Sequence, residues 1–90
     1  MKSNFEVAFS RKAAKFLKKL SISDKKQLTI ILKSINEIKY NPHDSKLLKG
    51  EFAGKRRKRK DHYRIIFQID KKSNKIQILK IGKRKNIYKN

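Results

Sequence analysis

The sequence predicts a small α+β fold, in which an N-terminal strand and a helical hairpin pack on one face of an antiparallel sheet that a C-terminal three-stranded meander completes. Apolar residues alternate near the N-terminus, recur at helical spacing from residue 11 to residue 40, and alternate again from residue 63 onward. Ninety residues with one proline and three glycines leave room for one core and almost no linker. Residues 1–90 are therefore expected to form a single domain.

The first elements are a strand and two helices. The alternation at residues 5–9 indicates a half-buried strand. Ser10 can then cap a helix over about residues 11–20, whose apolar side chains fall on one face. Ser23 or Asp24 can cap a second helix, which must end before Pro42 because proline disfavours helical conformation in the residue before it. The short link between them predicts neighbouring antiparallel helices.

The second half of the chain is expected to be strand-rich. Two runs with alternating or continuous apolar residues flank the polar turn at residues 71–74. A further turn at residues 60–62 would make the basic run before it a strand of the same sheet. The expected order after the helices is thus a loop at residues 41–50, followed by three strands at residues 55–59, 63–70 and 76–81.

The strongest compositional signal is positive charge. The chain carries 27 Lys and Arg against 7 Asp and Glu, a net charge of +20, which indicates a polyanionic partner. Of these 27 cations, 17 lie in residues 46–90, and six are consecutive from Lys55 to Lys60. A content of 37% hydrophobic residues in clear periods argues against the disordered state that such a charge would otherwise suggest.

The basic run can be interpreted in two ways. As a strand, it would project Lys55, Arg57 and Arg59 onto the face of the sheet that the helices leave uncovered, with Arg64 of the next strand nearby. That arrangement would form a cationic cleft on a rigid platform. As a loop, the same run would be a solvated segment for nonspecific contact with nucleic acid. The stretch alone does not decide between them.

Other classes of protein are disfavoured. No stretch approaches the roughly 18 apolar residues of a membrane helix, and the N-terminus has no apolar signal region, so we expect a cytoplasmic protein. The absence of cysteine excludes disulfides and thiolate metal sites. The two histidines and seven acids form no ligand cluster of recognisable spacing, and we therefore expect neither a metal nor another cofactor.

Four segments in order and spacing resemble the RelE/ParE superfamily of toxins. They are FEVAFSRKAAKFLKKL at the start, LKG at 48–50, YRIIF at 63–67, and IGKR at 81–84 with Tyr88 four residues on. The resemblance covers essentially the whole chain. It implies a RelE-like fold and a type II toxin of the RelE branch, a ribosome-dependent mRNA endonuclease that inhibits translation and that a cognate acidic antitoxin, similar to RelB, silences.

The resemblance also implies a set of site residues. The family's catalytic positions correspond to Arg64, Arg84 and Tyr88, and its RNA-binding positions to Lys55, Arg57, Arg59 and Lys83. The residue types suit the chemistry, because cleavage without a metal can use the RNA 2′-hydroxyl as nucleophile and arginine can hold the phosphate through forked hydrogen bonds. Tyr88 could stack on a base or transfer a proton, and a lysine or tyrosine could be the general base. The sequence leaves these roles open.

Two positions depart from the family pattern. Lys83 stands where many relatives have histidine, and His62 is either a substitute or an ordinary turn residue. Lys58 and Lys60 occupy positions that are often aliphatic and face the core, which puts the register of the basic strand in doubt.

Two other functions remain as alternatives. A ParE-type toxin on the same fold would inhibit DNA gyrase without nuclease activity, whereas Arg64, Arg84 and Tyr88 favour the nuclease. A basic RNA-binding or ribosome-associated module would need only net charge, so no single arginine should matter.

Overall fold

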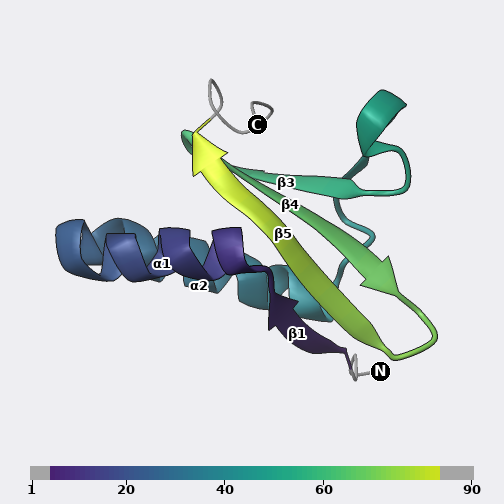
Figure 1. Ribbon diagram of the computed structural model, residues 1–90, viewed down its shortest axis with the longest axis horizontal. Coiled ribbons are helices and arrows are strands. Elements are labelled where there is room, and N and C mark those ends of the chain that lie inside the picture. The colour runs from purple at the N-terminus through teal and green to yellow at the C-terminus, as the bar shows by residue number, and fades with distance from the viewer. Residues whose placement is uncertain (1–4, 84–90) are drawn as a thin grey trace.

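The computed structural model describes residues 5–83, which form two helices and a five-stranded sheet, and it confirms the α+β fold class (Figure 1). Both helices pack on one face of the sheet. The elements are β1 (Glu6–Phe9), α1 (Arg11–Ser23), α2 (Lys25–Tyr40), β2 (Lys46–Leu47), the 3-10 turn η1 (Gly50–Phe52), β3 (Arg56–Lys60), β4 (Tyr63–Asp70) and β5 (Lys75–Lys83). None of the described helices is long and apolar enough to cross a membrane.

The sheet differs from the expected one in two respects. Its order is β1-β5-β4-β3-β2, and β1 runs parallel to β5, so the sheet is mixed and not antiparallel throughout. Side-chain alternation predicts which face of a strand is buried but not the direction of its neighbour. The second difference is β2, which lies in the predicted loop and is too short at two residues to show any alternation.

Both helices begin at the predicted caps. The Ser10 hydroxyl accepts a hydrogen bond from the Ala13 N–H at 3.0 Å, and a carboxylate oxygen of Asp24 accepts one from the Gln27 N–H at 3.2 Å. The first helix continues to Ser23 instead of ending at residue 20, and the Asp24 N–H donates to the Leu20 carbonyl at 2.8 Å. A single residue therefore separates the two helices and holds them as a hairpin.

The core lies between the helices and the sheet. Ile65 and Phe67 of β4 are completely buried in this core. Phe16 of α1 packs edge to face against Tyr63, with 6.0 Å between the ring centroids. The strands contribute Ile76 and Ile78 of β5 to the same cluster. Burial of these side chains fixes which residues of β4 and β5 point away from the helices.

A β-bulge interrupts the pairing of β4 with β5. Ile66 lies opposite Lys80, whereas the next residue, Phe67, lies opposite Ile78, so Leu79 is the extra residue. Strict alternation from Ile78 would have sent Lys80 into the core. The bulge instead turns Lys80 to the side of Ile66 and returns the following residue, the buried Ile81, to the core.

The junction of β1 with α1 is bonded to this bulge. The Ser10 hydroxyl, besides capping α1, donates to the Leu79 carbonyl at 2.6 Å, and the Ser10 N–H donates to the Ile78 carbonyl at 2.9 Å. One side chain thus links the start of a helix to the irregular turn of a strand 69 positions away in sequence.

The Ser10→Ala variant should lose both the cap and the bond to the bulge. We expect a loss of about 1–3 kcal/mol in the free energy of unfolding, since a cap and a neutral hydrogen bond each contribute about 1 kcal/mol. Urea unfolding followed by circular dichroism measures it. Ser21→Ala is the matched control, because the Ser21 hydroxyl bonds only within α1, to the Lys18 carbonyl. Equal losses in the two variants would contradict the linking role of Ser10.

Candidate nucleic-acid interface

The side of the sheet away from the helices carries the basic residues of alternate positions on β3. Arg57 lies opposite Ile66, and Arg59 lies opposite Arg64. Directly opposed residues share a face of an antiparallel pair. Because Ile65 and its alternate neighbours on β4 face the core, these three arginines face away from it. The basic run is therefore a strand, as the first interpretation predicts, and Arg57, Arg59 and Arg64 lie together.

The other residues of β3 explain how cations fit beside the core. Lys58 lies opposite the buried Ile65 on the helix side, where its side chain is 18% exposed and its ammonium lies 3.5 Å from a carboxylate oxygen of Glu37 on α2. Arg56, also on that side, donates from its guanidinium to the Ser45 carbonyl at 3.2 Å. The predicted register thus holds, and polar partners at the margin of the helices replace the aliphatic contacts that Lys58 lacks.

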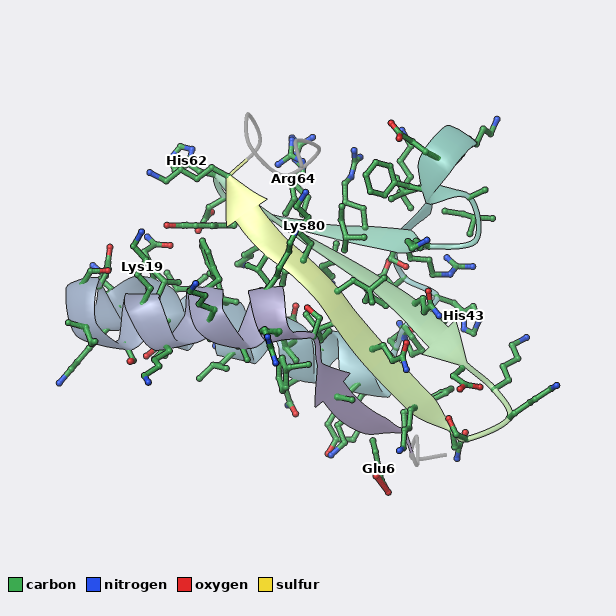
Figure 2. The ribbon with its side chains drawn as sticks, viewed as in Figure 1. Glu6, Lys19, His43, His62, Arg64 and Lys80 are labelled. Atoms are coloured by element: carbon green, nitrogen blue, oxygen red, sulfur yellow. The ribbon has the colours of Figure 1, made fainter. Side chains whose placement is uncertain are left out.

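Two further lysines join the arginines. Lys46 of β2 lies opposite Arg57, and Lys80 of β5 lies opposite Ile66, so one row across the sheet contains Lys46, Arg57, Ile66 and Lys80. The neighbouring row contains Arg59, Arg64 and Gly82. Figure 2 shows Lys80 and Arg64 next to each other on β5 and β4. We call these five basic residues the cationic face: Lys46, Arg57, Arg59, Arg64 and Lys80.

Arg64 is the central residue of this face. It lies on the middle strand of the sheet and is only 5% exposed, between β3 and β5. A guanidinium binds phosphate oxygens through two parallel hydrogen bonds, and a side chain held in place by its surroundings needs little reorganisation to do so. The arrangement is thus suited to hold a phosphate at a fixed point.

Acidic residues are placed away from the cationic face. None of the seven lies in β3, in β5 or in β4 before Asp70. Asp70 and Glu6 lie beside Lys75 at the far end of the sheet, and Figure 2 shows Glu6 remote from Arg64. Hydrogen bonds from Ser73, its side chain before its backbone N–H, lower the pKa of Asp70, which is committed to the β4–β5 turn.

Of the other expected site residues, Lys83 lies on the opposite face of the sheet. Lys83 is exposed and lies opposite Tyr63, a core residue, so it belongs to the helix side of β5 and not to the cationic face. Lys55 is half-buried and precedes β3, where its carbonyl accepts from the Leu48 N–H at 2.9 Å. Arg84 and Tyr88 lie outside the described residues, and their roles stay predictions.

The remaining candidate features contribute little to this site. His62 is exposed in the β3–β4 turn, after Asp61, whose φ of 54° lies in the left-handed region. No group of three or more His, Asp or Glu among residues 5–83 converges on a point that could hold a metal. A cavity of about 540 Å³ opens beside the end of β5, where its lining includes Phe16, Leu20, Tyr63, Lys80, Ile81 and Lys83.

Lys46 and Lys80 were not found from the sequence. The position of Lys46 depends on a two-residue strand, and that of Lys80 depends on a bulge, neither of which leaves a pattern in the residue types. For Lys80, the surrounding apolar run favours a core-facing strand, and the lysine inside it was the one signal of an interruption.

Comparisons with known proteins agree over nearly the whole chain. A family model described as the ParE-like toxin of type II bacterial toxin-antitoxin systems matches residues 7–90. A candidate toxin of Methanocaldococcus jannaschii, RelE4, is 33% identical over 86 residues, which cover 94% of this chain and 92% of that protein.

Solved structures share the fold. The toxin-antitoxin complex RelBE2 from Mycobacterium tuberculosis contains a chain that matches with a TM-score of 0.77 at 26% identity, covering 89% of this chain and 98% of that one. A chain of the archaeal RelE-RelB complex from Pyrococcus horikoshii OT3 matches with a TM-score of 0.72 at 26% identity, covering 91% and 97%.

The two sides of β3 should differ in polyanion binding. Arg57→Met removes a cation from the cationic face and should weaken binding to heparin about tenfold, whereas Lys58→Met removes one from the helix side and should change it less than about twofold. Isothermal titration at fixed salt measures both. Stability should change by less than about 1 kcal/mol in Lys58→Met, because its ion pair is partly exposed. Equal losses of affinity would mean that net charge alone governs binding.

Proposed function

The chain belongs to the ParE-like toxin family of type II toxin-antitoxin systems, and from this premise we propose that it is a ribosome-dependent endoribonuclease that cuts mRNA. The observation that supports this function most directly is the burial of Arg64 at the centre of the cationic face. A protein that bound polyanions by net charge alone would need no arginine fixed on the middle strand of its sheet.

The proposed reaction is an in-line attack within the RNA. The 2′-oxygen forms a bond to the adjacent phosphorus while the bond from phosphorus to the 5′-oxygen breaks, which leaves a 2′,3′-cyclic phosphate and a 5′-hydroxyl. The 2′-hydroxyl loses a proton to a base, and the leaving 5′-oxygen gains one. Negative charge grows on the phosphoryl oxygens in the transition state, so prepositioned cations at that point accelerate the reaction.

Arg64 is suited to that stabilising role. Its backbone is held on both sides by strand pairing, and its side chain is buried, so little reorganisation is needed when charge develops. We assign Arg84 and Tyr88 to the same catalytic set by their place in the family motif, Arg84 at the phosphate and Tyr88 in base stacking or proton transfer. Arg57 and Arg59 would bind the flanking RNA backbone.

An acidic antitoxin is the proposed protein partner. The similar chains from M. tuberculosis and P. horikoshii were solved in complexes named RelBE2 and RelE-RelB. A net charge of +20 favours an acidic chain that folds on this surface. The same charge favours the ribosome as a landing surface, where RNA supplies attraction and the decoding site supplies geometry.

Cleavage can be mapped by primer extension on an mRNA held on stalled ribosomes. We expect cuts within the A-site codon, and Arg64→Ala and Arg84→Ala should each slow them by about 10²- to 10³-fold. Lys33→Ala on the exposed side of α2 is the matched control for loss of one charge. A 2′-deoxy nucleotide at the cut position should abolish cleavage, because it removes the nucleophile.

The alternatives make different predictions in that experiment. A folded, ribosome-binding wild type that leaves the mRNA intact would contradict the nuclease, and inhibition of gyrase supercoiling by the same preparation would indicate the ParE-type activity. Cutting that persists after the 2′-deoxy substitution would contradict attack by the 2′-hydroxyl.

The antitoxin complex should be sensitive to salt. We expect its dissociation constant to rise at least about tenfold between 0.1 M and 0.5 M NaCl, because oppositely charged surfaces are screened. Surface plasmon resonance with an acidic RelB-like chain measures it, and the loss should appear mainly in the association rate. An affinity that is constant across this range would refute the electrostatic part of the proposal.

A further inference from the structure

We propose that Lys80 is a further substrate-binding residue, which holds the phosphate next to the one that is cut, so that the RNA crosses the sheet from β3 to β5. The inference rests on the proposed function and adds a residue that the family motifs leave out. Three observations carry it: the bulge that aims Lys80, its place in the row beside Arg64, and the absence of any other described cation at that point of β5.

The bulge is the first observation. A regular β5 would place Lys80 with Ile78 among the fully buried core residues, where a charged ammonium is strongly disfavoured. The extra residue Leu79 turns Lys80 onto the cationic face instead, and the Ser10 hydroxyl holds that irregularity through the Leu79 carbonyl. Bulges next to functional sites commonly re-aim one side chain in this way.

The second observation is the geometry of the row. Lys80 and Arg57 lie opposite the same residue, Ile66, on its two sides, so each is a diagonal neighbour of Arg64 at about 7–8 Å between backbones. Arg64 is thus flanked by one cation on β3 and one on β5. This spacing is comparable with the distance between successive phosphates of an extended nucleic-acid strand, so the two flanking cations suit the phosphates before and after the scissile one.

The third observation concerns the β5 side of Arg64. The residue directly opposite is Gly82, which brings no charge to that position. Lys83 faces the helix side. Lys75 lies beside Asp70, about 13 Å from Lys80 along the strand direction and further still from Arg64. Among the described residues of β5, Lys80 is therefore the cation placed to contact a substrate bound at Arg64.

A path across the strands follows from these positions. Lys46, Arg57 and Lys80 occupy one row, on β2, β3 and β5, at multiples of the interstrand spacing of about 4.8 Å. An RNA lying along β3 would contact Arg57 and Arg59 but would not reach β5. An RNA crossing the sheet contacts the cations of this row while its scissile phosphate lies at Arg64. Lysine suits the flanking position, since it binds a phosphate as a point charge without the fixed fork of arginine.

The test compares Lys80→Gln with Lys75→Gln, which removes the same charge from the same strand and side of the sheet. In single-turnover cleavage on stalled ribosomes, Lys80→Gln should raise the half-saturating protein concentration about tenfold while the rate at saturation stays within about twofold, because a flanking contact contributes equally to the ground state and the transition state. Lys75→Gln should change neither quantity. Lys80→Arg should restore most of the affinity.

A binding measurement tests Lys80 independently of cleavage. With a short single-stranded RNA carrying 2′-O-methyl groups, Lys80→Gln should reduce the slope of log affinity against log salt by about 0.7, the value for one lost phosphate contact, and Lys75→Gln should leave it unchanged. Thermal unfolding by circular dichroism checks that both variants fold.

The outcomes separate this inference from the proposed function. Wild-type protein that does not cut refutes the nuclease, while the salt slope still tests the contact. If the wild type cuts and Arg64→Ala does not, but Lys80→Gln matches Lys75→Gln in both assays, the assignment of Lys80 is overturned. A fall in the saturated rate alone would also overturn it, because that result places Lys80 at the scissile phosphate.

Discussion

The whole interface depends on the packing of one face of β4 against the helices. Ile65 and Phe67 are completely buried, and their burial sets the direction of every other side chain on the strand. A slip of one residue in the pairing of β4 would exchange its two faces and place Arg64 in the core. Hydrophobic burial therefore specifies the register of β4 strongly. The cationic face is therefore held by apolar contacts that do not touch it.

The second constraint comes from the junction of β1 and α1. Ser10 begins a helix and also bonds to the bulge of β5, so the N-terminal part of the chain influences the aim of Lys80. A bulge interrupts the regular hydrogen bonding between two strands, and bulges are common where they re-aim a side chain next to a functional site. Here it returns Ile81 to the core and places Lys80 on the opposite side.

Local pattern was enough to predict most of the fold. Alternation and capping residues predicted both helices and three of the five strands, and a possible turn at residues 60–62 offered β3 as one of two interpretations, in which Arg57 and Arg59 share a side with Arg64. Features that depend on pairing between distant segments were missed, namely the parallel direction of β1, the short β2 and the face of the sheet on which Lys80 lies. The face on which Lys83 lies also depends on such pairing, since it is set by the register opposite Tyr63.

The positive charge of β3 also opposes self-association of the protein. Its neighbour β2 pairs only with Arg56 and Arg57, so Lys58, Arg59 and Lys60 lie on a stretch of strand that the described part of the sheet leaves uncovered on one side. Uncovered strand edges invite pairing with a second copy, and lysine or arginine on the edge opposes it by repulsion and hydration. The basic run that attracts polyanions thus also discourages edge-to-edge aggregation. Replacing its cations with neutral residues would reduce solubility as well as polyanion binding.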